Sequence, residues 1–377
     1  MSAPGRPIRV ALVHDWLTGM RGGEKVLACL CRMFPDADIF TLIHRPGACP
    51  PIDGRSIRTS WLDDLPGVAR YYRRLLPLMP LAVERMDVSD YDLVISSSHC
   101  VAKGIGGIRA GQVHVCYCHT PMRYVWAVEE DYRRQAGVSG MLLRAFTPYL
   151  RAWDRRSAGR ADLFLANSAC VARRIRQAYG RTAVVLYPPV DVDYFTPADV
   201  QREDFYLVVA AMAPYKRIDQ AVAAFASLKR PLKIIGSGPL LGRLRAAAPP
   251  NVEFLGWQAD EVLRDHYRRC RAVIFPQLED FGLVPLEAMA CGTPVIAFGA
   301  GGALETVLDA ADPAVPAPTG LLYDPQTPEA LAATVQQFEA LTGRFDPKAL
   351  RRWAVKFSPK EFMDGFRRAV HPLVVTP

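Results

Sequence analysis

The 377-residue sequence lacks any long apolar run. The first candidate, residues 10–13, is short and is followed at once by His14 and Asp15, so we expect no secretory leader. The longest weakly charged region, residues 281–304, contains Glu287, two prolines and many glycines. That composition is poor for a membrane span, so the sequence predicts a protein without one.

The sequence also lacks a cysteine framework. Its nine cysteines are scattered, and most lie inside apolar runs, as Cys100 and Cys291 do. Without a secretory context we expect reduced, packed thiols in the cytoplasm. Cys116 and Cys118 stand beside His119, which would suit a metal ion, but no second ligand pair follows at zinc spacing. Packed thiols are therefore the preferred interpretation.

No nucleic-acid module and no internal repeat is present, although the chain is basic. The net charge is +8, from 46 Lys and Arg against 38 Asp and Glu, which calls for an anionic partner. Nucleic acid would need aromatics interleaved along a basic stripe or a known module, so we expect no nucleic-acid partner. The densest basic segments, residues 70–76 and 144–160, mix arginines with large apolar side chains at helical spacing. They suit either an anionic membrane surface or solvated, arginine-rich helices.

The first half of the chain alternates strands and helices. Residues 8–13 form a continuous apolar run, typical of a buried parallel strand. Gly19, Gly22 and Gly23 follow, and a helical pattern covers residues 24–33; this order opens a doubly wound α/β domain. The glycine spacing does not match the dinucleotide fingerprint, so the loop indicates either close approach by a ligand or a plain tight turn. Further strands are predicted at residues 39–43, 93–96, 113–117 and 163–166, and a helix at residues 167–178 capped by Ser168.

A second alternating series begins at residue 206. The patterns predict strands at residues 206–210, 232–235, 252–255, 272–275 and 294–298, and helices at residues 218–228, 260–270 and 328–341. Gly236 and Gly238 suit a phosphate- or ribose-facing turn, but Pro239 removes an N–H group there, so we expect no nicotinamide site. Asp191 and Asp193 match a metal-nucleotide D-x-D pair, yet they lie in a proline-rich connection rather than at a strand end. We interpret that match as coincidence.

Two acids near the start of a predicted helix form the main candidate site of the second series. Glu279 is expected on the loop after strand 272–275, and Glu287 in the first turn of a helix that begins near Pro285 and stops at Gly292. The N–H groups of a first helical turn favour an anion, so the two acids would hold a sugar's hydroxyls beside its phosphates. The alternative is that Glu287 complements the helix dipole and Glu279 is a solvated loop acid.

His119 is the candidate of the first series. It follows a predicted buried strand, at the carboxyl end where ligands of open α/β sheets collect. A neutral imidazole there can donate to a sugar hydroxyl or stabilise developing charge.

In their order along the chain these motifs resemble the GT-B glycosyltransferases of family 4, a retaining, metal-independent group that uses nucleotide-sugar donors. The stretches HTPMRYVW and PYKR further resemble bacterial O-antigen mannosyltransferases. The matching positions are Gly22-Gly23, His119-Thr120-Pro121, Asn167-Ser168, residues 187–191, Lys216, Gly236-Ser237-Gly238 and the pair Glu279 and Glu287. The resemblance implies two doubly wound Rossmann-like domains facing a central cleft. It also implies no metal and no cofactor other than the nucleotide diphosphate-sugar co-substrate.

The resemblance implies a role for each matching residue. Glu279 would contact the donor sugar close to the reacting carbon, and His119 would line the acceptor side. Lys216 would neutralise the diphosphate, and Glu287 would take the ribose hydroxyls. The other donor-binding positions would be Gly22, Gly23, Gly236, Gly238, Trp257, Phe281, Gly282 and Leu283. In the retaining mechanism the leaving phosphate takes the acceptor proton, which fits the absence of an obvious nucleophile.

One position departs from the family pattern. An arginine commonly precedes the lysine by about five residues, but Ala211 holds that place here. A diphosphate contact would be lost unless Arg217, beside Lys216, replaces it.

The expected domains are an N-terminal acceptor-binding domain at residues 1–187 and a C-terminal donor-binding domain at residues 201–356. A proline-rich linker at residues 188–200 would join them. Residues 357–377 would form an amphipathic helix and tail that cross back to the N-terminal domain, with Phe357, Phe362, Phe366 and Val370 on its apolar face.

We therefore expect a transferase that moves a hexose, mannose from GDP-mannose first, onto a lipid-linked glycan in bacterial polysaccharide or lipopolysaccharide synthesis. It would be cytoplasmic and peripherally associated with the inner face of the plasma membrane. The alternatives are a UDP-sugar-dependent transferase of the same family, a nucleotide-sugar epimerase of the same fold, and a non-catalytic, sugar-binding assembly partner.

Overall fold

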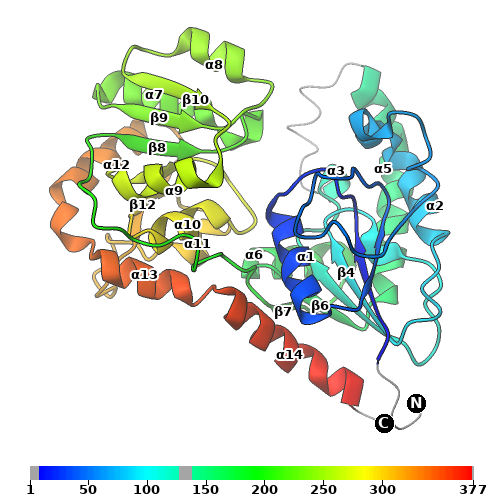
Figure 1. The fold of residues 1–377 in the computed structure, drawn as a ribbon. Helices are drawn as coiled ribbons and strands as arrows, with labels where there is room; N and C mark the ends of the chain where they lie inside the picture. Colours follow the sequence, from blue (N-terminus) through cyan, green and yellow to red (C-terminus); the bar gives the residue numbers. More distant parts are fainter. Residues whose placement is uncertain (1–7, 127–137, 376–377) are drawn as a thin grey trace. The chain divides into compact units, whose positions relative to one another are not determined.

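The computed structural model describes residues 8–126 and 138–375, apart from the side chains of residues 138–144, 342 and 375. The chain divides into two compact units (Figure 1). Met1–Pro189 and Lys360–Pro377 form the N-terminal unit, and Val190–Pro359 form the second unit. No helix in the described part of the chain is both long and apolar enough to cross a bilayer.

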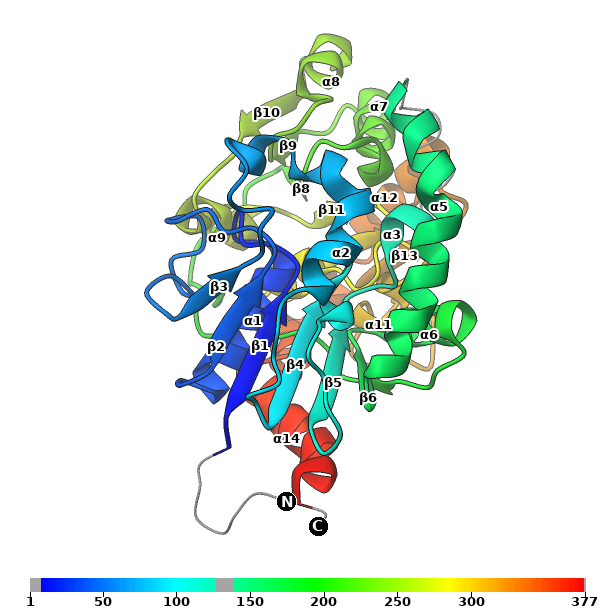
Figure 2. The same cartoon turned by 90° about the vertical axis from the view of Figure 1, so that its right-hand side faces the viewer.

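The N-terminal unit is built on a parallel seven-stranded sheet in the order β3-β2-β1-β4-β5-β6-β7. Figure 2 shows the strands from β3 to β6 side by side. The strands are β1 (Val10–His14), β2 (Asp38–Thr41), β3 (Ile57–Thr59), β4 (Leu93–Ser98), β5 (Val113–Cys118), β6 (Leu163–Ala166) and β7 (Val184–Val185). The helices are α1 (Gly22–Met33), η1 (Val68–Arg70), η2 (Tyr72–Leu78), α2 (Met79–Glu84), η3 (Ala102–Gly104), α3 (Arg123–Trp126), α5 (Val138–Ser157), η4 (Ala158–Arg160), α6 (Ala169–Tyr179) and α14 (Pro359–Val375).

Side-chain alternation along the strands divides these helices between the two faces of the sheet. Leu12 of β1 packs with α1 and α14 in one core. Ala11 and Val13, which point the other way, pack with η2, α2 and α5 in a second core. Ser168 accepts a hydrogen bond from the N–H group of Val171 at 3.1 Å, so it caps α6 as the sequence predicts.

The second unit repeats this plan with a parallel six-stranded sheet in the order β10-β9-β8-β11-β12-β13. The strands are β8 (Tyr206–Val209), β9 (Leu232–Ile235), β10 (Val252–Gly256), β11 (Val273–Phe275), β12 (Val295–Phe298) and β13 (Gly320–Tyr323). The helices are η5 (Pro214–Lys216), α7 (Ile218–Leu228), α8 (Leu241–Ala247), α9 (Asp260–Arg269), α10 (Leu283–Ala290), α11 (Ala303–Thr306), α12 (Pro328–Ala340), η6 (Thr342–Arg344) and α13 (Pro347–Val355).

Each sheet has one point where the strand order reverses. In the N-terminal unit it lies between β1 and β4, and in the second unit between β8 and β11. Chain connections leave these neighbouring strands in opposite directions, which opens a crevice at their carboxyl ends where ligands of doubly wound sheets bind. The predicted α/β class with two doubly wound sheets is confirmed. The sequence patterns missed β3, β7 and β13, of which the first two are short and exposed.

The connection expected as a linker at residues 188–200 contains the boundary between the two units and packs on the second unit from Val190 onward. Val190, Val192 and Phe195 are buried. The Arg351 guanidinium on α13 donates to the carbonyls of Val192 and Phe195, at 3.1 and 3.0 Å. The prolines and acids of this stretch therefore alternate with core residues.

The C-terminal helix predicted over residues 356–370 is present, but it begins three residues later than predicted. α13 ends at Val355, and α14 begins at Pro359, whose missing N–H group suits a first helical position. Phe357 in the break packs against Trp353 in the second unit, with ring centroids 5.7 Å apart. On α14, Phe362 and Phe366 are buried in the N-terminal unit with α1.

Candidate functional site

The strand reversal of the second unit carries a pair of opposite charges. Lys216 ends η5 in the loop after β8, and Glu279 lies in the loop after β11. The Lys216 ammonium forms an ion pair with Glu279 Oε1, and Gln277 Nε2 donates to the same oxygen at 3.3 Å. The Lys216 and Glu279 side chains are 16% and 23% exposed. The sequence predicted both residues for one site, and the structure brings them into contact.

The turn after β12 packs against the loop that carries Glu279 and fixes its backbone. The Gly302 N–H group donates to the Glu279 carbonyl at 2.9 Å. A Cβ atom on Gly302 would overlap the backbone of Phe281, so the two loops approach closer than any side chain would allow. The backbone of Glu279 is therefore fixed, while its carboxylate lies at the sheet edge.

The glycine turn after β9 packs against the loop after β8. Gly236 and Gly238 have φ angles of 140° and 154°, which strongly favour glycine. A Cβ atom on Gly238 would lie 2.7 Å from the carbonyl oxygen of Met212, and the Met212 N–H group donates to Ser237 at 2.8 Å. These glycines thus hold the lysine loop, and Ala211, in the place of the family arginine, is exposed on it.

Glu287 lies about two residues further into its helix than the sequence predicted. α10 begins at Leu283, with Gly282 before it at a φ of 91°, so Glu287 belongs to the second turn. A position just beyond the first turn weakens the alternative that it complements the helix dipole. Glu287 is only 5% exposed, and its Oε2 accepts a hydrogen bond from the Tyr267 hydroxyl at 3.2 Å. Burial, followed by the charge of Glu287, raises the pKa of Tyr267 well above its ordinary value, so this tyrosine stays a donor.

Two further predicted donor residues lie at the edges of this site. Arg217 has a left-handed backbone (φ 52°), and its Nε lies 3.6 Å from Asp219 in the first turn of α7. Trp257 follows β10 and is 75% exposed. So large an exposed indole offers a flat face on which a planar ring can stack.

The strand reversal of the N-terminal unit carries histidines. His14 ends β1, Ser97 lies in β4, and His119 follows β5. Ser97 Oγ lies 3.1 Å from His14 Nδ1 and 2.8 Å from His119 Nε2. A hydroxyl has one proton to donate and two lone pairs, so at most one of the two imidazoles accepts from Ser97 and at least one donates to it. The tautomers of His14 and His119 are thereby linked.

The glycines predicted to face the donor lie beside these imidazoles. α1 starts at Gly22, two residues before the predicted start. A Cβ atom on Gly23 would lie 3.4 Å from His14 Cε1 and 3.6 Å from His119 Nε2. Glycine therefore leaves open the space between the helix start and the two rings.

The charge states of this cluster follow from its burial. Burial lowers the pKa of His119 to about 3, helped by His99 and His14, so its imidazole is neutral at physiological pH. Burial would raise the pKa of Glu24, but His14, whose Nε2 lies 3.8 Å from its carboxylate, more than offsets this and the pKa is lowered. A neutral His119 agrees with the role predicted from the sequence.

Sequence reasoning missed most of this cluster. His14, Asp15, Ser97 and His99 were not singled out, although they follow or end the two strands that flank the reversal. Their position at the ends of apolar runs could have indicated them as site residues. The sequence alone does not show that β1 and β4 are neighbours in the sheet. Strand order is a tertiary property that no single run displays.

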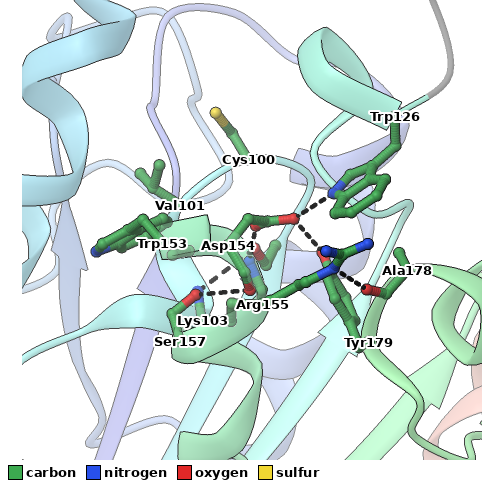
Figure 3. A network of polar contacts seen from close by, with 12 residues as sticks. Cys100, Val101, Lys103, Trp126, Trp153, Asp154, Arg155, Ser157, Ala178 and Tyr179 are labelled. Atoms are coloured by element: carbon green, nitrogen blue, oxygen red, sulfur yellow. Dashed lines mark hydrogen bonds and ion pairs between the residues drawn. The ribbon is translucent and has the colours of Figure 1, made fainter. Parts of the chain in front are cut away.

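A buried polar network fixes the segment that follows His119 (Figure 3). Asp154 of α5 pairs with Lys103, and both side chains are 1% exposed or less. The Asp154 Oδ2 also accepts from Trp126 Nε1 at 2.7 Å and from the Tyr179 hydroxyl at 2.8 Å. The network joins α3, α5, α6 and the loop after β4, so it positions both chain segments that carry histidines.

The cysteines behave as the sequence predicts. All nine are free and buried. Within residues 8–126 and 138–375, no three His, Cys, Asp or Glu side chains are grouped to hold a metal ion. Cys116 and Cys118 pack with α6.

Two doubly wound sheets, each with polar side chains gathered at its strand reversal, define a protein of the GT-B type. Two family models match consecutive stretches: Glycosyltransferase Family 4 over residues 20–194 and Glycosyl transferases group 1 over residues 195–354. The chain belongs to the family 4 glycosyltransferases.

Curated relatives agree with this assignment. The chain is similar to the D-inositol 3-phosphate glycosyltransferase of Geodermatophilus obscurus, with 29% identity over 56% of this chain and 53% of that protein. It is also similar to the GDP-mannose-dependent alpha-(1-6)-phosphatidylinositol monomannoside mannosyltransferase of Mycobacterium tuberculosis, with 31% identity over 42% of this chain and 50% of that protein. The chain spans about half the length of the curated relatives it matches.

Among solved structures, the chain is similar to HepE of Anabaena in complex with UDP. The TM-score is 0.72 and the identity 19%, over 97% of this chain and all of that one. At this identity the likeness establishes the fold.

Proposed function

We propose that the protein is a retaining glycosyltransferase that moves a hexose, mannose from GDP-mannose first, from a nucleotide diphosphate to a lipid-linked glycan in bacterial polysaccharide or lipopolysaccharide synthesis. The observation that carries this proposal is the Lys216–Glu279 pair at the strand reversal of the second unit. A diphosphate-sugar presents both an anion for the ammonium and hydroxyls for the carboxylate. Both charges are already at the position where a nucleotide-binding sheet holds its ligand.

In this proposal the second unit binds the donor. Lys216 leaves Glu279 and neutralises the diphosphate, with Arg217 in place of the missing family arginine. The N–H groups of Phe281, Gly282 and Leu283 at the start of α10 bind the phosphate or sugar. Donor recognition is completed by the Gly236 and Gly238 turn, by Glu287 at the ribose and by Trp257 at the base.

The N-terminal unit binds the acceptor, with neutral His119 beside the attacking hydroxyl and Gly22 and Gly23 giving the donor room. In the retaining step the acceptor oxygen bonds to the anomeric carbon on the face from which the diphosphate departs. The hydroxyl proton passes to the leaving phosphate oxygen. Cationic side chains and helix N–H groups offset the leaving-group charge, so the proposal includes no metal and no cofactor.

Two observations bear on the donor base. The relative from Mycobacterium tuberculosis is GDP-mannose-dependent by name, which supports GDP. HepE was solved with UDP, which supports a UDP-sugar as the second candidate. A thermal-shift panel of GDP- and UDP-sugars separates them, because a ligand at 100 times its Kd stabilises the native state by about 2.7 kcal/mol.

The acceptor is proposed to be held at the inner face of the plasma membrane, where the protein docks peripherally. Support comes from one surface of the N-terminal unit, on which η2, α2 and α5 lie together: Glu84 at the end of α2 accepts from Trp153 of α5 at 2.9 Å. Among the described side chains of these elements, the exposed large apolar and aromatic ones are Leu78, Leu81, Phe146 and Tyr149, and Arg73, Arg74 and Arg156 are exposed arginines. Apolar side chains among arginines suit an anionic bilayer surface.

Donor turnover tests the proposal. Purified protein is supplied with GDP-mannose, or with the UDP-sugar selected by the thermal-shift panel, and with polyprenyl-diphosphate-linked oligosaccharides that end in mannose, galactose or N-acetylglucosamine. Nucleoside diphosphate release and a heavier glycan are expected. Donor binding without release, with every acceptor, would favour the non-catalytic, sugar-binding alternative.

A further inference from the structure

Asp15 organises the loop that follows β4. It lies directly after β1 and is fully buried. One carboxylate oxygen accepts the N–H groups of His99 and Cys100, at 2.7 and 3.0 Å, and the other accepts those of Val101 and Ala102, at 2.6 and 2.8 Å. The same carboxylate lies 2.9 Å from His99 Nδ1.

These contacts fix the state of the His99 ring. Burial would raise the pKa of Asp15, but His99, His14 and the loop N–H group outweigh it and hold that pKa well below its ordinary value. Asp15 is thus an ionised carboxylate and can only accept from Nδ1. The proton of a neutral His99 therefore resides on Nδ1, and Nε2 carries the lone pair.

The other side of His99 is available to a ligand. Its side chain is 28% exposed, whereas that of His14 is fully buried. The ring packs on Trp16 in an edge contact, with centroids 4.5 Å apart. Among the described residues, Asp15 is the only polar side chain in hydrogen-bond contact with the His99 ring.

His99 belongs to the same group of rings as His119. Its centroid lies 6.3 Å from that of His119 and 5.9 Å from that of His14. His14 Nε2 is buried and has no hydrogen-bond partner among the described residues, with the nearest carboxylate oxygen of Glu24 at 3.8 Å. The cluster thus contains ring nitrogens that form no hydrogen bond with any residue that the structure describes.

We propose that His99 is a further acceptor-binding residue, whose Nε2 accepts a hydrogen bond from a hydroxyl of the acceptor sugar while Asp15 holds the ring. The inference rests on the proposed function and identifies a contact of its acceptor site. A sugar hydroxyl fits better than a phosphate, because a lone pair beside an ionised carboxylate attracts a donor and repels an anion.

The alternative explanation is that His99 only holds its loop in place through its contact with Asp15 and binds no ligand. Two substitutions separate the accounts because each keeps a different half of the imidazole. His99→Asn keeps an N–H donor near the position of Nδ1 and removes the polar atom at Nε2. His99→Gln carries its polar atoms farther out, near Nε2, and gives up the short donor to Asp15.

The experiment measures KM for acceptor and donor, with the donor and the polyprenyl-diphosphate-linked oligosaccharide that the wild-type protein uses. We expect His99→Asn to raise the acceptor KM about five- to tenfold, the size of one neutral hydrogen bond. Its melting temperature, donor KM and rate of donor hydrolysis by water should match those of the wild-type protein. His99→Gln should retain more acceptor affinity than His99→Asn.

The opposite pattern would overturn the inference. His99→Asn would then have the acceptor KM of the wild-type protein, whereas His99→Gln would have a lower melting temperature and weaker acceptor binding. That result would show that His99 only holds its loop to Asp15. Failure of the proposed function is recognised separately, since the wild-type protein would then transfer no sugar before any variant is made. The pH profile of acceptor KM gives a second readout, in which the groups facing His99 are Asp15, His14, His119 and Glu24.

Discussion

Lys216 and Glu279 contact each other across the two loops that flank the strand reversal of the second unit. Both side chains are partly exposed, so the pair contributes at most about 1 kcal/mol to folding. Its importance lies in placement, because each charge is held where it can turn to a ligand at little cost in stability.

Glu279→Ala should abolish sugar transfer with little change in nucleotide affinity, because the carboxylate is proposed to contact the sugar rather than the nucleotide. Steady-state transfer rates and GDP titration by calorimetry check this. Glu329→Ala, at an exposed acid on α12, is the matched control and should keep both properties. Wild-type transfer by Glu279→Ala would refute the assignment.

Glu287→Ala should weaken nucleotide binding and also destabilise the protein. Removing the carboxylate leaves the buried Tyr267 hydroxyl without this acceptor, at a cost of about 1–3 kcal/mol. Tyr267→Phe removes the hydroxyl alone and separates the two effects: denaturant unfolding should report a loss of stability, while GDP affinity stays close to that of the wild-type protein. Equal nucleotide affinity in Glu287→Ala would remove Glu287 from the donor site.

Replacing Arg73 and Arg74 together by alanine should reduce binding to liposomes that contain anionic lipid, by about 1 kcal/mol for each charge near the surface. Co-sedimentation at two salt concentrations measures the change, and the difference should shrink at high salt. Arg243→Ala combined with Arg352→Ala, at exposed positions of the second unit, changes the net charge equally. If both double variants partition alike, the basic segment has no specific role at the membrane.

Two neutral histidines of the N-terminal unit make its stability depend on pH. Burial lowers the pKa of His114 to about 4, and that of His119 to about 3, from an ordinary value of 6.5. Since the unfolded chain binds these protons more readily, their contribution is present above pH 6.5 and is lost progressively as the pH falls toward 3–4. Unfolding midpoints measured from pH 7 to pH 4 should fall less steeply in His114→Asn. Parallel profiles would show that His114 is protonated as easily in the folded state.

Asp154→Ala should be strongly destabilising, by about 3–5 kcal/mol, because it leaves the Lys103 ammonium buried without its counter-charge. Lys103→Met combined with Asp154→Asn removes both charges and keeps an amide oxygen for Trp126 and Tyr179. Thermal unfolding should show that this double variant recovers most of the loss. An equally unstable double variant would mean that the ion pair itself is required.

Strands, helices and motif residues could be predicted from the sequence, whereas the side-chain contacts between different helices and strands could not. The strand at residues 232–235 was predicted to the residue, and Lys216 and Glu279 were assigned to one site, because strands and motif spacing are properties of short stretches. The Tyr267–Glu287 contact joins α9 to α10, and no periodicity within either helix indicates it. Asp15 was overlooked for a similar reason, since its partners lie more than 80 residues away.

The connection at residues 190–200 shows what average composition does not reveal. Its prolines and acids predicted a linker, and the interleaved Val190, Val192 and Phe195 also pack as core residues. Because buried and polar residues alternate from Val190 to Phe195, the average composition of the stretch does not reveal that every second or third side chain there is in the core.

The division of the N-terminal unit has a consequence for how the protein is made. Its sheet is synthesised before the second unit, yet Phe362, Phe366 and Val370, which cover one face of that sheet, leave the ribosome after it. At ordinary synthesis rates the whole second unit separates the two events by roughly ten seconds or more. During that interval an apolar surface of the nascent chain is uncovered, and truncation before α14 would leave that surface open permanently.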